Sequence, residues 1–127
     1  MAIKVFDSEL RIMKILWEQG PTPARDVAHI LEDEVGWNVN TTYTTIKKLI
    51  RKKAIERREP KFECHPIITR EQVQAQEARE LGRKLFGGSA SALLASFLSD
   101  KRISKSEIEE MKRLINEFDE NSEDQAG

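Results

Sequence analysis

The spacing of apolar residues predicts a chain built mainly of α-helices. Apolar positions recur at steps of three and four residues, which places them on one face of a helix. Gly20-Pro21 and Gly87-Gly88 are typical helix ends, and capping signals precede several of the apolar segments. The predicted helices cover about residues 8–19, 23 to 34 or 36, 40–53, 70–86, 89–98 and 104–118. Asp7 and Thr22 are the expected N-caps of the first two, with Pro23 at the first position of the second helix.

The alternation of side chains changes between the third and fourth predicted helices. Apolar and charged residues alternate in two short segments, 55–59 and 62–67, on either side of Pro60-Lys61. A period of two around a proline turn predicts a β-hairpin.

This order of elements predicts a mainly α fold with two parts. Three helices followed by a hairpin are the layout of a winged helix-turn-helix, which we expect over residues 1–68. Three further helices would form a C-terminal domain over residues 69–120. Residues 121–127 lack apolar side chains, and we expect them to be disordered.

Composition narrows the class of protein. A chain of 127 residues can bury one modest core, or two small ones if the second is shared with another copy. We expect a cytoplasmic protein without membrane insertion, since the sequence has no long apolar run and no secretory leader pattern. No nucleophile–base pair or phosphate-binding glycine loop is evident, so we expect neither an enzyme nor a bound cofactor.

The net charge of −1 hides a strong partition between the two ends of the chain. Residues 41–61 carry eight cations and two anions, whereas residues 104–127 carry three cations and eight anions. Such asymmetry indicates a polyanionic partner for the basic segment.

The third helix combines short hydroxyl side chains at its start with cations towards its end. Side chains of the first kind can contact base edges in a major groove, while later lysines and arginines bind phosphates. Asn40 is the expected N-cap. A solvated helix face is the simpler alternative, although β-branched threonines are unfavourable on an exposed helix surface. With Arg25 of the second helix and a basic wing over residues 57–61, the candidate DNA contacts are Arg25, Asn40, Thr41, Thr42, Thr44, Thr45, Lys48, Arg51, Lys52, Arg58 and Lys61.

The last three helices carry more apolar side chains than so short a segment can bury alone. We expect two copies to share one core there, as in DNA readers that use two-fold symmetry. Folding of these helices onto the winged domain of the same chain is the alternative. The candidate dimerisation residues are Leu81, Leu85, Phe86, Leu93, Leu94, Phe97, Leu98, Ile108, Met111, Ile115 and Phe118.

Two other functions remain open from the residues alone. Cys64 and His65 could serve a thiol- or metal-responsive regulator, but neighbours on a strand point to opposite faces and cannot easily bind one ion. An inward cysteine beside an outward histidine is the favoured interpretation. A winged helix could also be a protein-docking module without DNA binding.

Two sequence blocks carry a family resemblance: Asn40-Thr41-Thr42-Tyr43-Thr44 and Phe86-Gly87-Gly88. With Phe6-Asp7-Ser8-Glu9-Leu10, they make residues 3–118 resemble the penicillinase repressor family, which includes methicillin-resistance and copper-transport repressors. The resemblance implies a dimeric repressor that binds a palindromic promoter operator, with residues 40–53 as the groove-reading helix.

The resemblance also implies a candidate site of regulation. Some members are cleaved in the dimerisation domain after a membrane-bound sensor detects a β-lactam, which makes a membrane sensor-protease system a candidate partner. The corresponding bond is Ser96-Phe97, and the antibiotic-responsive members have asparagine in place of Ser96. Copper-responsive members have a cysteine-rich C-terminal metal site, whereas the C-terminal segment here has no cysteine.

Overall fold

The computed structural model describes the backbone of residues 3–126 and the side chains of residues 3–122. The chain divides between Ala78 and Arg79 into two compact units. The division lies inside α4 (Arg70–Phe86), while the domain boundary expected between residues 68 and 69 stays a prediction. The physical reason is that Val73, in the first half of α4, is buried in the core of the first unit.

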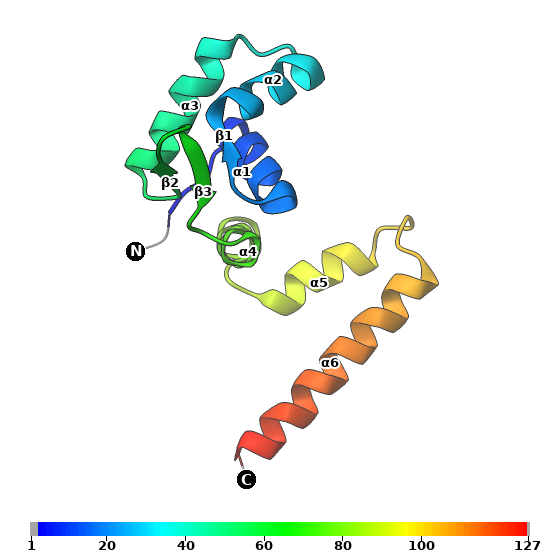
Figure 1. Ribbon diagram of the computed structural model, residues 1–127. Coiled ribbons are helices and arrows are strands. Elements are labelled where there is room, and N and C mark those ends of the chain that lie inside the picture. Colours follow the sequence, from blue (N-terminus) through cyan, green and yellow to red (C-terminus); the bar gives the residue numbers. More distant parts are fainter. Residues whose placement is uncertain (1–2, 127) are drawn as a thin grey trace. The chain divides into compact units, whose positions relative to one another are not determined.

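The first unit is a winged helix (Figure 1). Three antiparallel strands form its sheet in the order β1-β3-β2. In the β2–β3 hairpin, Ile55 pairs with Pro66 and Arg58 pairs with Glu63. The elements before α4 are α1 (Asp7–Gln19), β1 (Thr22–Pro23), α2 (Ala24–Val35), α3 (Val39–Arg51), β2 (Ile55–Arg58) and β3 (Glu63–Pro66).

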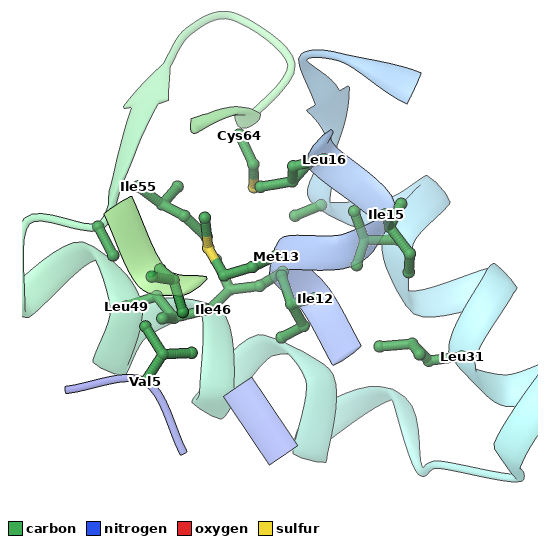
Figure 2. Close-up of a cluster of buried hydrophobic side chains, with 14 residues drawn as sticks. Val5, Ile12, Met13, Ile15, Leu16, Leu31, Ile46, Leu49, Ile55 and Cys64 are labelled. Atoms are coloured by element: carbon green, nitrogen blue, oxygen red, sulfur yellow. The ribbon is translucent and has the colours of Figure 1, made fainter. Parts of the chain in front are cut away.

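The core joins the helices to the hairpin. Figure 2 shows Met13 of α1 near Ile46 of α3 and Ile55 of β2, while Leu16 of α1 lies beside Cys64 of β3. All five side chains are almost fully buried. This packing places α3 against α1 on one side and leaves its other side exposed.

Helix ends differ from the sequence expectation in three places. Phe6, rather than Asp7, is the N-cap of α1, and Glu9 accepts a 2.9 Å hydrogen bond from the Phe6 backbone N–H. Pro23, rather than Thr22, is the N-cap residue of α2, and both residues form the short strand β1. Asn38, rather than Asn40, caps α3, and its Oδ1 accepts from the Asn40 backbone N–H at 2.8 Å.

The second unit contains the end of α4 together with α5 (Ala90–Leu98) and α6 (Lys105–Ala126). Ser89 caps α5, with its Oγ 3.0 Å from the Ala92 backbone nitrogen. Residues 121–126 were expected to be disordered but continue α6 as helix, because no glycine or proline interrupts it before Gly127. Gly127 itself lies outside the described residues.

No helix among residues 3–126 is both long enough and apolar enough to span a bilayer.

Candidate nucleic-acid interface

The exposed side of α3 carries one continuous polar and basic stripe. At 3.6 residues per turn, Asn40, Thr44, Lys47 and Arg51 lie along one line of the helix. Thr41 and Lys48 lie beside that line, and all six side chains are exposed. The small hydroxyl and amide groups are in its first half, and the cations are in its second half. We call these six residues the α3 stripe.

Two threonines of the predicted DNA contacts are not part of this stripe. Thr42 is 0% exposed and Thr45 is 7% exposed, because both face the core beside Ile46 and Leu49. The Thr45 hydroxyl donates to the Thr41 carbonyl oxygen at 2.8 Å. Both threonines are buried on the core side of α3, a position usually taken by apolar residues. We therefore remove Thr42 and Thr45 from the candidate DNA contacts.

Lys52, another predicted DNA contact, binds protein groups instead. Its ammonium group lies 2.6 Å from Oε1 of Glu9 in α1 and 3.0 Å from the Lys4 carbonyl oxygen. It also lies 4.5 Å from the centre of the Phe6 ring. Lys52 therefore connects the end of α3 to the N-terminal segment.

Three further predicted contacts are placed as expected at the surface. Arg25 is exposed in the first turn of α2, and Arg58 and Lys61 are exposed on the hairpin. Lys47 was absent from the candidate contacts although the α3 stripe contains it. Its spacing from Asn40 and Thr44 in the sequence could have identified it.

The hairpin is less basic than expected, because its charges balance. Residues 55–66 contain three cations and three glutamates. The Arg57 Nε donates to Glu59, and an Arg58 Nη donates to Glu56 at 3.3 Å. Both arginines of the wing are therefore paired with glutamates. The expectation of a basic wing is wrong, because the wing carries no net positive charge.

Cys64 and His65 lie on opposite sides of β3. Cys64 is fully buried, and burial raises the pKa of its thiol to about 11. His65 Nε2 lies 2.6 Å from Oε1 of Glu63. Among the described residues, no group of three or more histidine, cysteine or acidic side chains is arranged to bind a metal ion.

The second unit does not bury its own described apolar side chains. No apolar side chain described between residues 79 and 122 is buried. Five candidate dimerisation residues are half-buried: Phe86, Leu93, Leu94, Ile108 and Met111. The other six are exposed: Leu81, Leu85, Phe97, Leu98, Ile115 and Phe118. Ser96 and Phe97 are both exposed on α5.

Sequence comparison decides the family. Residues 6–117 match the family described as penicillinase repressor. The chain belongs to the penicillinase repressor family. It is a DNA-binding transcriptional repressor. Two relatives of this family member are named as a regulatory protein and as a repressor.

Relatives of the penicillinase repressor family match nearly the whole chain. The methicillin resistance regulatory protein MecI of Staphylococcus aureus (strain N315) is 21% identical over 89% of this chain and 94% of its own length. The penicillinase repressor of Bacillus licheniformis is 22% identical over 90% of this chain and 91% of its own.

A solved structure supports the winged-helix fold of this family member. The DNA-binding domain of the repressor BlaI superposes with a TM-score of 0.53 and 24% identity. The superposition covers 57% of this chain and 90% of that domain.

Proposed function

We propose that the chain works as a homodimeric repressor that binds a palindromic promoter operator, with α3 in the major groove of each half-site. The observation that carries this proposal is the α3 stripe, since the described part of α3 exposes polar and basic groups along its whole length. A helix of this kind fits the width of a B-DNA major groove.

The two halves of the stripe have different roles in this proposal. Asn40, Thr41 and Thr44 are short enough to contact base edges, so they would read sequence. Lys47, Lys48 and Arg51 would bind phosphates, which adds affinity without sequence information. Arg25 and the wing residues Arg58 and Lys61 would contact the flanking backbone.

Dimerisation through the second unit explains its uncovered apolar faces. Leu85, Ile115 and Phe118 are each more than half exposed in the single chain. Fully burying one such side chain is worth about 1.5–3 kcal/mol. A second copy of the same helices is the proposed cover, because a symmetric reader places two α3 helices on two half-sites of one duplex.

We further propose the Ser96–Phe97 bond as the place where a membrane sensor-protease system would act on the repressor. Both residues are exposed, but they lie inside helix α5. The helix would have to open before cleavage. Incubation with the partner protease, followed by mass analysis of the fragments, tests this; cleavage elsewhere or none would reject it.

The binding proposal is tested by a DNA titration. The purified protein first selects fragments from a genomic DNA pool, and one selected duplex is compared with a scrambled duplex of equal length. Affinity should fall by roughly 10³-fold or more between about 50 and 200 mM salt, as expected for several phosphate contacts per dimer. A flat salt response, or equal affinity for both duplexes, would reject the proposal.

A further inference from the structure

Phe62, just before β3, contacts three separate elements of the first unit. Its carbonyl oxygen accepts a 2.9 Å hydrogen bond from the Ala24 backbone N–H at the start of α2. Its ring meets the Tyr43 ring of α3 edge-on, with centroids 5.8 Å apart and planes at 76°. The Arg57 guanidinium carbon of β2 lies 3.7 Å from the centre of the Phe62 ring. One residue therefore connects the wing to α2 and α3.

The backbone of Phe62 is unusual for an aromatic residue. Its φ is +49°, in the left-handed region that glycine adopts most easily. A bulky side chain in this region indicates that its contacts outweigh the backbone strain. The contacts of the ring with Tyr43 and Arg57 are the ones that a glycine would lose.

Contact with the ring holds the Arg57 guanidinium in a defined place. The Arg57 side chain is 46% exposed and donates from Nε to Glu59. A guanidinium has five N–H donors in one plane, so its terminal amino groups can bind an anion while Nε keeps its carboxylate. A phosphate is the anion that this planar arrangement binds well.

Arg58, the next residue, lies in a different environment. Successive strand residues point to opposite faces, and Arg58 pairs with Glu56 at 3.3 Å. The Arg58 side chain is 56% exposed, similar to that of Arg57, but none of the described aromatic rings lies against its guanidinium. The two arginines therefore form a natural comparison.

We propose that Arg57 is the principal phosphate-binding residue of the wing, and that Phe62 and Tyr43 are positioning residues that fix its guanidinium relative to α3. This inference rests on the proposed function, because it assumes that α3 lies in the groove. The wing and the α3 stripe then approach DNA as one preorganised surface. Preorganisation favours binding because less freedom is lost when the complex forms.

The first experiment compares Arg57→Lys with Arg58→Lys in the full-length protein. Both substitutions keep the charge, and only the first replaces a guanidinium that lies on a ring. The probe is a mixed-sequence DNA duplex about 30 base pairs long, enough for two half-sites one helical turn apart. Arg57→Lys should weaken binding by roughly 5-fold or more in a dimer, and Arg58→Lys by less than about 2-fold. Equal effects of the two substitutions would overturn the inference.

A double-mutant cycle tests the role of Phe62. In a Phe62→Leu background, the added Arg57→Lys change should cost less than about 2-fold, since the ring is already absent. Effects that simply multiply would show that Phe62 does not act through Arg57. The melting temperature of each variant monitors folding; if Phe62→Leu does not fold, the comparison of Arg57→Lys with Arg58→Lys decides the inference alone.

Salt dependence provides a readout that a purely structural role would not change. Log affinity falls with log salt, and Arg57→Ala should make this fall less steep by about 0.9 per protomer, as expected for one lost phosphate contact. An unchanged slope would overturn the assignment of Arg57.

Lys48→Ala serves as the reference substitution within α3. If Lys48→Ala weakens binding and the Arg57 variants do not, this inference fails while the proposed function stands. If neither weakens binding, the proposed function fails.

Discussion

Glu9 of α1 and Lys52 at the end of α3 form an ion pair that is largely removed from solvent. The Lys52 Nζ lies 2.6 Å from Oε1 of Glu9, and their side chains are 29% and 4% exposed. Glu9 also accepts the Phe6 backbone N–H at 2.9 Å. The pair therefore connects the C-terminal end of α3 to α1, the first helix of the chain.

Lys52→Met should destabilise the protein without removing a phosphate contact. The change leaves the Glu9 carboxylate buried without its cation, which should lower the free energy of unfolding by about 2–3 kcal/mol. This is less than for a fully buried pair, because the Lys52 side chain is 29% exposed. The slope of DNA affinity against salt should stay at its wild-type value. Urea unfolding and a salt titration measure the two quantities.

Lys53→Met is the matched control for Lys52→Met. Lys53 is the exposed neighbour of Lys52, so its replacement should change the free energy of unfolding by less than about 0.5 kcal/mol. If Lys52→Met lowers the salt slope as much as Lys48→Met does, Lys52 contacts DNA after all.

The same substitution at two threonines of α3 should have opposite consequences. Thr42 Oγ1 is buried and has no hydrogen-bond partner among the described residues, whereas Thr44 is exposed in the α3 stripe. Thr42→Val should leave DNA binding unchanged and raise the free energy of unfolding by up to about 1 kcal/mol, because a buried unpaired hydroxyl is removed. Thr44→Val should reduce discrimination between a selected and a scrambled duplex by roughly 1 kcal/mol or more. Competition binding distinguishes the two, and reduced discrimination by Thr42→Val would contradict the placement of Thr42.

These two threonines also show where sequence analysis of the site was limited. Apolar spacing identified α3 but did not reveal that Thr42 and Thr45 lie on its core side. Threonine carries both a methyl and a hydroxyl group, so its type does not reveal which side of a helix it occupies. Long-range partners are a second limit, since nothing near Lys52 in the sequence indicates Glu9.

Most of the fold was predictable because its signals are local. Capping residues and glycines predicted α4 and the start of α5, and alternation around Pro60 predicted the hairpin. Strand β1 was not predictable, since its two residues form a strand only by pairing with Cys64 and Glu63. A strand that depends on residues distant in the sequence has no periodic signal of its own.

Phe118→Asp should convert the proposed dimer into single chains and weaken DNA binding. Phe118 is 74% exposed in the single chain, so its loss should cost the isolated unit little. A carboxylate in a shared apolar core would be unfavourable unless it were paired. Sedimentation should show a halved mass.

Asn116→Asp is the control for Phe118→Asp, because it adds the same charge at another exposed position of α6. It should keep the dimer. An intact dimer with Phe118→Asp would exclude this residue from the interface.

Cys64 should make stability depend on pH in the alkaline range. Burial raises the pKa of its thiol from 9.0 to about 11, so the folded state holds this proton more tightly than the unfolded state. The resulting stability is fully present below pH 9 and is lost as pH rises towards 11, by at most about 2–3 kcal/mol. Unfolding curves across this range measure the effect.

Cys64→Ala is the comparison for that pH dependence. Its unfolding free energy should be lower at neutral pH because of the lost packing, and it should fall less steeply between pH 9 and 11. Parallel pH profiles of the two proteins would contradict the role of the thiol.

The two outer strands of the small sheet leave little for another chain to extend. Strand β1 has only two residues, and Pro23 lacks an N–H donor. Strand β2, on the other side, exposes Glu56, Arg57 and Arg58. Short length, proline and charge are the features that discourage strand addition at a sheet edge. Within residues 3–126, the repressor is therefore poorly suited to seed β-type aggregates, even at high local concentration.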